Sequence, residues 1–108
     1  MLRKVEAFLT PSKLDALRDM LVKLKIEGMS VMQVQGFGTR SKVKNGTPQF
    51  EDRVKVEIVV DESKIDGVLR GIQALAGDGQ IGAGKVFVIP VEDAVRLSTR
   101  ESGKSAVT

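Results

Sequence analysis

The chain has 108 residues, with 17 basic and 14 acidic side chains, a net charge of +3, and no His, Cys, Trp or Tyr. This composition excludes disulfides, thiol nucleophiles, imidazole bases and zinc sites built on His or Cys, and with them most of the chemistry of small enzymes. Because those residue types are missing, the sequence predicts a protein that is not an enzyme and has no metal site or prosthetic group. With no apolar span of membrane length and no signal-peptide pattern at its start, it predicts a cytoplasmic protein.

The first elements predicted along the chain are a strand and a helix. Apolar residues alternate with polar ones before Thr10, which is the period of a half-buried strand; they are Val5, Ala7 and Leu9. Ser12 stands three residues before Asp15, the spacing of a capping box at a helix start. The helical repeat that follows consists of Leu14, Leu17, Leu21 and Leu24, with Gly28 just past the expected helix end. A further strand is predicted from Ser30 to Gln35.

A long polar link, residues 39–52, follows Gly36-Phe37-Gly38. It has few apolar anchors, so we expect it to project as a mobile loop, and loops this long are usually functional or disordered. The next strand is indicated by the alternation of Val54, Val56, Ile58 and Val60. Ser63 and Asp66 repeat the capping-box spacing ahead of an apolar helical stripe that ends before Gly77. The last predicted strand is Val86 to Val91.

The two halves of the chain resemble each other. Lys4-Val5-Glu6 recurs as Lys55-Val56-Glu57, and the same register aligns Ser12 to Asp15 with Ser63 to Asp66. Two such units give the order β-α-β-β-α-β, an α+β, ferredoxin-like fold with an antiparallel sheet and both helices on one face. The other face of the sheet remains partly apolar, because Phe8, Val31 and Val59 are expected to point there. Since the core is small, we expect self-association to cover this face.

The segment from Ala76 to Lys85 contains Gly77, Gly79, Gly82 and Gly84. Glycines this dense allow backbone N–H groups to form a concave anion nest, and Lys85 adds a charge suited to phosphate. It is not a Walker A loop, because that motif lies between a strand and a following helix. Taken alone, the segment is equally consistent with a plain turn between a helix and a strand.

Assembled in this order, the segments closely resemble the PII signal-transduction family over nearly the whole chain. The motifs that carry the resemblance are Lys13-Leu14-Asp15, Gly28-Met29-Ser30, Val34-Gln35-Gly36-Phe37-Gly38, Lys55-Val56-Glu57-Ile58-Val59-Val60, the segment from Gly79 to Val88, and Val95-Arg96-Leu97. The resemblance implies a homotrimer that holds adenine nucleotides in the clefts between neighbouring subunits. It implies one domain, residues 1–100, with a T-loop at 39–52 that meets partner proteins and a B-loop at 76–85 that cradles phosphates. Residues 101–108 are expected to be a flexible tail.

The resemblance also implies a set of site residues. On one side of each cleft, the residues expected at the nucleotide are Gly36, Phe37, Gly38, Thr39, Val59, Gly82, Gly84 and Lys85. The adjacent subunit is expected to supply Gly28, Met29 and Ser30 around the base and Arg96 at the phosphates. Ser98 stands where the family has a second arginine, and Arg100 is the expected replacement. Arg40 and Arg53 are expected to bind an effector anion.

Departures from the family pattern shape the predicted function. The T-loop has no tyrosine, which excludes uridylylation or adenylylation there, and the loop is short. Thr39-Arg40 replaces an Arg-Gln pair whose glutamine helps to hold magnesium and 2-oxoglutarate, so magnesium binding stays open. The predicted function is a sensor of ADP, AMP or ATP that regulates a transporter or metabolic enzyme, with bicarbonate or another small anion as a co-effector. The alternative is a conventional nitrogen-regulatory PII protein that responds to ATP and 2-oxoglutarate, favoured if Arg40 or Gln49 supplies the missing contacts.

Two other functions share this topology. An RNA-binding module would stack bases on aromatic residues of the sheet, but only Phe8 and Phe87 lie on predicted strands, so no nucleic-acid partner is expected. An acylphosphatase-like enzyme would use an arginine and an asparagine, but Asn45 lies in Asn45-Gly46, a plain turn signal. Both functions are disfavoured.

Overall fold

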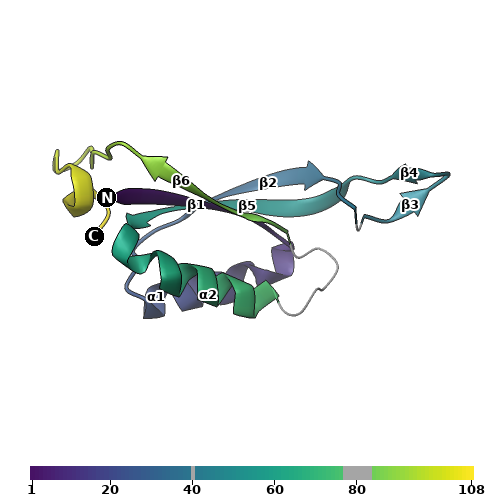
Figure 1. Ribbon diagram of the computed structural model, residues 1–108, viewed down its shortest axis with the longest axis horizontal. Coiled ribbons are helices and arrows are strands. Elements are labelled where there is room, and N and C mark those ends of the chain that lie inside the picture. The colour runs from purple at the N-terminus through teal and green to yellow at the C-terminus, as the bar shows by residue number, and fades with distance from the viewer. Residues whose placement is uncertain (40, 77–83) are drawn as a thin grey trace.

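A computed structural model describes residues 1–39, 41–76 and 84–108 of the protein. Its strands and helices, shown in Figure 1, are β1 (Leu2–Leu9), α1 (Leu14–Lys23), β2 (Ser30–Gly36), β3 (Val43–Lys44), β4 (Thr47–Pro48), β5 (Glu51–Asp61), α2 (Ile65–Ala76) and β6 (Val86–Val91). Single 3-10 turns occur at Pro11–Lys13, Glu62–Lys64 and Gly103–Ala106. Apart from the short β3–β4 pair, this is the predicted order of elements.

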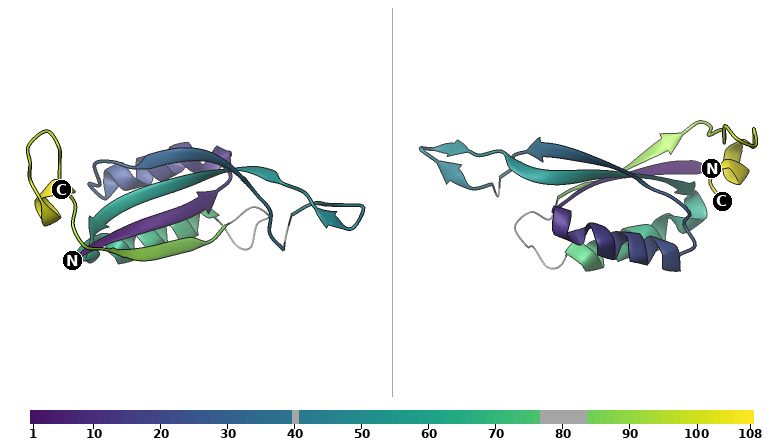
Figure 2. Two further views of the ribbon diagram at one scale, coloured as in Figure 1. Left: turned by 90° about the horizontal axis from the view of Figure 1, so that it is seen from above. Right: turned by 180° about the vertical axis from the view of Figure 1, so that it is seen from behind.

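The main sheet has four antiparallel strands in the order β2-β5-β1-β6. Both helices lie on one face of it, as the two side views in Figures 1 and 2 agree. The two first-half strands therefore flank β5, and the pairing of β1 with both β5 and β6 is that of the split β-α-β arrangement. The predicted ferredoxin-like α+β fold is confirmed.

The core lies between the sheet and the helices. Alternate residues of the central strands face the helices and are fully buried; among them are Val5, Ala7, Val56 and Ile58. Each helix contributes a pair of buried residues one turn apart, Leu17 and Leu21 from α1 and Val68 and Ile72 from α2. The helices approach closely at Gly71, where a Cβ atom would lie 2.5 Å from the sulfur of Met20. These apolar stripes are the ones that the sequence periodicity predicts.

Strand register decides what the uncovered face of the sheet carries. Phe8 pairs with Lys55 and Val59 pairs with Lys4, so both apolar residues lie on the open face, as predicted. Val31 pairs with Val56, whose side chain is buried against the helices, so the prediction that Val31 faces away from them was wrong. Because side chains alternate along a strand, the open face of β2 is formed by its even-numbered residues instead.

Both predicted capping boxes were also wrong. Ser12 and Ser63 lie within the 3-10 turns that precede the helices, and no side chain caps the first of these turns. In the second, the carboxylate of Asp61 accepts a hydrogen bond from the N–H of Ser63 at 3.1 Å. Hydrogen bonds from the hydroxyl and then the N–H of Ser63 lower the pKa of Asp61 to about 2. The last residue of β5, an aspartate, therefore caps the turn as the serines were expected to cap the helices.

Helix α1 ends earlier than expected, at Lys23 rather than just before Gly28. Lys25 takes the left-handed conformation with φ 59°, and the N–H of Ile26 donates to the carbonyl of Leu21 at 3.0 Å. Together with a bond from Lys25 N–H to the carbonyl of Val22, this is a Schellman motif. Residues 27–29 are consequently free to run as extended chain into β2, and they reach one end of the sheet.

Candidate functional site

The polar link between β2 and β5 projects from the sheet, as expected, and forms a β-hairpin. Strands β3 and β4 pair across Asn45 and Gly46, whose φ angles of 52° and 75° are those of a type I′ turn. At the base of the hairpin the rings of Phe37 and Phe50 pack edge to face, 5.5 Å apart. The hairpin makes the molecule 53 Å long and only 23 by 21 Å across (Figure 1). It leaves Val43 exposed at its surface.

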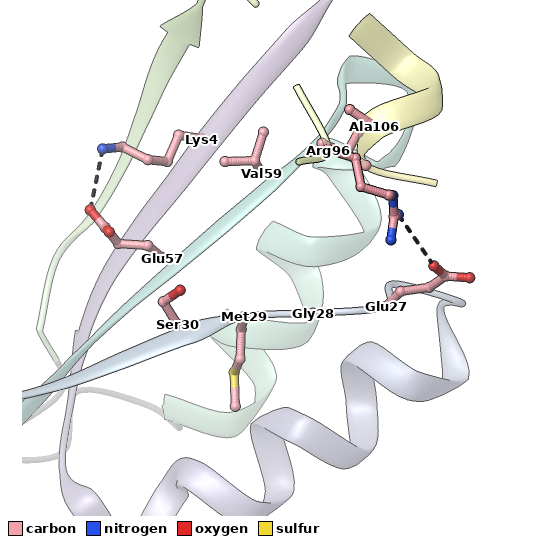
Figure 3. Close-up of a pocket in the computed structure, with 10 residues that line it drawn as sticks. Lys4, Glu27, Gly28, Met29, Ser30, Glu57, Val59, Arg96 and Ala106 are labelled. Atoms are coloured by element: carbon pink, nitrogen blue, oxygen red, sulfur yellow. Dashed lines mark hydrogen bonds and ion pairs between the residues drawn. The ribbon is translucent and has the colours of Figure 1, made fainter. Parts of the chain in front are cut away.

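A pocket of about 490 Å³ lies at the opposite end of the sheet, near the chain termini (Figure 3). It is lined by Lys4, Glu27, Gly28, Met29, Ser30, Glu57, Val59, Arg96, Ala106 and Val107. The open face of the sheet forms one side of it, through Lys4 of β1, Ser30 of β2 and the β5 residues. The chain before β2 and the chain after β6 form the other sides.

The side chains at this pocket differ in direction. Ser30 pairs with Glu57 across β2 and β5, so both side chains lie on the open face of the sheet. The side chain of Met29 points toward the helices in Figure 3 and packs against the core. The pocket thus combines an apolar surface from Val59 with carboxylate, hydroxyl and ammonium groups, a mixture typical of small-molecule sites.

Four charged residues of the open face form a network beside the pocket. Lys4 Nζ lies 3.2 Å from Glu57 Oε2 and 3.3 Å from Glu6 Oε1, and Lys55 Nζ contacts the same two carboxylates at 3.7 and 3.2 Å. The hydrogen bond with Glu57 is the main cause that raises the pKa of Lys4, and the bond from Lys55 is the main cause that lowers the pKa of Glu6. Lys4 and Glu6 therefore stay charged at neutral pH.

Arg96 supplies a second cationic group at the edge of the pocket. Its guanidinium lies 3.9 Å from Glu27 and 3.9 Å from Glu101, and it donates to the carbonyl of Thr108 at 3.5 Å. The Nε atom is buried and has no hydrogen-bond partner among the described residues. All of these contacts are long, so Arg96 retains capacity to bind an anion.

The other predicted nucleotide residues lie apart from this pocket. Gly36 ends β2, and Phe37 and Gly38 follow it at the base of the hairpin. The rise of about 3.3 Å per residue puts Gly36 roughly 20 Å from Ser30 along the strand. Gly84 and Lys85 precede β6 and adjoin β1, where the N–H of Phe8 donates to the carbonyl of Lys85 at 3.3 Å. Thr39 follows Gly38 in the same exposed segment.

The remaining predicted residues fall in several places. Val59 lies at the pocket with Gly28, Met29, Ser30 and Arg96. The family resemblance instead places it with Gly36 to Gly38. Ser98 and Arg100 are exposed in the turn after Arg96, and the N–H of Arg100 donates to the carbonyl of Arg96 at 2.7 Å. Arg40 and Gly82 lie outside the described residues.

Sequence reasoning missed five of the lining residues, Lys4, Glu27, Glu57, Ala106 and Val107. The repeated Lys-Val-Glu motif contained a signal for Lys4 and Glu57. Its central valines are buried, so the charged residues on either side of them must lie on the open face. No comparable pattern marks Ala106 and Val107, which a turn of the chain brings to the pocket.

Arg53, expected to bind an effector anion, already has a carboxylate partner. Its guanidinium lies 2.5 Å from Glu51 Oε2 and donates to the carbonyl of Asp52 at 2.7 Å. Glu51 also accepts a hydrogen bond from the N–H of Lys42, which with Arg53 lowers the pKa of Glu51. The ion pair lies within β5, and the hydrogen bond from Lys42 to Glu51 connects this strand to the base of the hairpin.

The comparisons with known proteins agree with this architecture. The model of the family described as nitrogen regulatory protein P-II matches residues 2–101. The chain belongs to the nitrogen regulatory protein P-II family. P-II proteins of Nostoc punctiforme and of a Synechocystis species are 42% and 39% identical to it, over 98% of this chain and 100% of theirs.

Solved structures of P-II proteins show the same fold. Arabidopsis thaliana PII bound to citrate is 37% identical, with a TM-score of 0.82 over 97% of this chain and 91% of that one. The ATP complex of Bacillus subtilis GlnK is 26% identical, with a TM-score of 0.85 over 98% and 97% of the two chains. In the part of this P-II chain that the structure describes, no helix is long and apolar enough to cross a membrane.

Proposed function

We propose that this P-II protein is a non-enzymatic sensor of adenine nucleotides. In this proposal three subunits associate through the open face of the sheet, and each cleft between neighbours binds one nucleotide. The link at residues 39–52, which contains the β3–β4 hairpin, is the T-loop, which docks on a transporter or a metabolic enzyme in the cytoplasm. Nucleotide occupancy then changes how the hairpin is presented to that partner.

The observation that carries the proposal is the pocket at one end of the sheet. It gathers Gly28, Met29, Ser30, Val59 and Arg96, all of them residues that the family resemblance assigns to the nucleotide. Gly84 and Lys85 lie elsewhere on the same subunit, so a site that uses both groups needs two chains. The complex of Bacillus subtilis GlnK with ATP, a protein of the same fold, supports a nucleotide as the ligand.

The charges favour a nucleotide with fewer phosphates than ATP. Ser98 stands where a family arginine would contact a phosphate, and Arg100 is turned into a tight bend with φ 63°. Thr39-Arg40 lacks the glutamine that would help to hold magnesium against a triphosphate. A triphosphate carries more negative charge than the remaining cations of the site readily offset. We therefore expect ADP or AMP to bind at least as tightly as ATP.

A co-effector anion has to compete with a carboxylate of the protein itself. Because Arg53 is paired with Glu51, bicarbonate or 2-oxoglutarate would have to replace that partner. Arg40, outside the described residues, is the other proposed contact. The names of the relatives, nitrogen regulatory proteins P-II, favour the alternative in which ATP and 2-oxoglutarate are the effectors.

Titration calorimetry with AMP, ADP and ATP, each with and without magnesium, 2-oxoglutarate or bicarbonate, tests the proposal. A charged hydrogen bond is worth about 1.5 to 3 kcal/mol, so Lys85→Ala should weaken nucleotide binding about ten- to a hundredfold. Lys44→Ala removes the same charge from the hairpin and should leave the affinity unchanged.

Absence of binding by any of the three nucleotides would contradict the proposal. Strong mutual cooperativity of ATP, magnesium and 2-oxoglutarate would instead establish the conventional nitrogen-regulatory function. If Lys85→Ala binds nucleotide as tightly as the wild type, the glycine-rich segment is a plain turn and not a phosphate site.

A further inference from the structure

One wall of the pocket is the chain that leaves helix α1 and runs into β2. Gly28, Met29 and Ser30 belong to this wall, and Figure 3 shows them following one another along the chain that comes from the helix. Helix α1 ends at Lys23, so only a short connection lies between the helix and the wall. The position of the wall therefore depends on how the chain turns away from the helix.

The turn that ends α1 has a backbone conformation that lysine adopts at a cost. Lys25 has a φ of 59°, in the left-handed region where a Cβ atom crowds the following carbonyl. The Schellman motif satisfies the carbonyls of Leu21 and Val22. The carbonyls of Leu24 and Lys25 lie beyond that motif, and the last carbonyls of a helix need partners from outside it. A partner for them would hold this strained turn in place.

Lys64 supplies that partner. Its Nζ atom donates to the carbonyls of both Leu24 and Lys25, each at 3.2 Å. The side chain belongs to the 3-10 turn Glu62–Lys64, which lies on the far side of β5 from α1 in the sequence. A positive group at the carboxyl end of a helix also interacts favourably with the helix dipole. One ammonium group thus ties the second half of the chain to the exit of the first helix.

The turn that carries Lys64 is itself held in place. The carboxylate of Asp61 caps it, whereas no side chain caps the corresponding turn of the first half, Pro11–Lys13. The N–H of Glu62 also donates to the carbonyl of Met1 at 2.8 Å. The base of the Lys64 side chain is therefore fixed, which suits a residue that holds another segment in place.

We propose that Lys64 is a positioning residue of the ligand site: its two hydrogen bonds fix the end of α1 and so set where residues 28–30 meet the nucleotide. The inference rests on the proposed nucleotide-sensing function and adds to that site a residue that does not line the pocket. Ser30 is paired in β2 and Met29 packs against the core, so the sheet fixes one end of the wall. Lys64 fixes the other end, and without it the strained turn at Lys25 relaxes and the wall shifts.

The test measures ADP affinity by calorimetry on variants of the full chain. Lys64→Met keeps the apolar stem, removes the ammonium group and should weaken ADP binding about three- to tenfold. Lys64→Arg can donate to the same carbonyls and should restore most of that loss. The matched control is Lys23→Met, which removes the same charge from the last turn of α1 and should bind ADP as the wild type does, because both hydrogen bonds of Lys64 remain.

A second control separates position from stability, because the loss of two hydrogen bonds also destabilises the fold. Ile72→Val removes one carbon atom from the buried face of α2, outside the pocket lining, and should lower the thermal midpoint. It should leave ADP affinity unchanged at a temperature where circular dichroism shows both variants to be folded.

The outcomes separate the two proposals. If the wild-type protein binds no AMP, ADP or ATP, the nucleotide-sensing function fails, and the role of Lys64 fails with it. If the wild type binds ADP and Lys64→Met binds it equally tightly, the positioning role is overturned while the sensing function stands. The same conclusion follows if Lys64→Arg restores no affinity, or if Ile72→Val loses as much affinity as Lys64→Met.

Discussion

Gly84 lies so close to strand β1 that no side chain fits there. A Cβ atom at this position would clash with the carbonyl oxygen of Phe8, which belongs to the backbone and cannot move aside as a side-chain end would. The sequence explains Gly84 as a residue that lets phosphate approach the backbone. The structure adds an independent reason, because the glycine also allows the chain entering β6 to pack against its neighbour strand.

Gly84→Ala should therefore lower both stability and nucleotide affinity, since the start of β6 has to shift away from β1 and carries Lys85 with it. Thermal unfolding and calorimetry with ADP measure the two effects. Gly67→Ala in helix α2 is the matched control, because the added Cβ would meet only the side chain of Leu24, at the ordinary contact distance of 3.7 Å. That variant should gain about 0.5 to 1 kcal/mol of stability and bind ADP normally. A Gly84→Ala protein as stable as the wild type would contradict the close contact.

At the scale of elements, periodicity predicted the strands and helices well, and local signals predicted their ends poorly. The strand predicted from the alternation in β5 and the helices predicted from the apolar stripes of α1 and α2 are present, because burial of one face requires these patterns. The capping boxes failed because the 3-10 turns shift each helix start past its serine, and Lys25 ends α1 where no glycine stands. The face of Val31 depended on its pairing with Val56, a long-range register that one strand alone does not contain.

The candidate site was predictable to the extent that it follows short motifs. Gly28-Met29-Ser30 and Arg96 were predicted, and the pocket brings them together. Glu57 required the register that sets it opposite Ser30, and Val107 required the turn at Gly103, whose course depends on contacts with Asp93 and Ala94. Contacts between distant segments, which a single sequence does not display, account for both omissions.

The cap at Asp61 predicts a pH dependence of stability. Its pKa is lowered to about 2 in the folded protein from an ordinary value of 3.8, so its contribution is complete above pH 3.8 and is lost as the pH falls through 2. Asp61→Asn keeps the shape of the side chain and removes this titration. Between pH 5 and pH 2 the thermal midpoint should fall less in the variant than in the wild type. Superimposable curves of midpoint against pH would show that the carboxylate is not a cap.

At the scale of the whole molecule, the open face of the sheet is the feature that one subunit leaves unexplained. It carries apolar residues such as Phe8 and Phe87, whose rings pack edge to face at 6.3 Å, beside the network of Lys4, Glu6, Lys55 and Glu57. Phe87 is 48% exposed in the single chain. An interface here would bury these rings around paired charges, and it would bring the pocket of one subunit toward a neighbour's Gly84 and Lys85.

Mixing two defective variants tests whether each cleft is shared. Lys85→Ala and Arg96→Ala should each weaken ADP binding, because each removes one cation from every cleft of its own trimer. In a cyclic trimer that contains both variants, one of the three clefts combines the intact Lys85 of one chain with the intact Arg96 of its neighbour. Unfolding and refolding the two proteins together should therefore restore a fraction of sites with wild-type affinity, measured by calorimetry after mass spectrometry has verified mixed trimers. Mixed trimers without any restored site would show that both residues act within one chain, and a monomer in sedimentation at micromolar concentration would refute the shared cleft altogether.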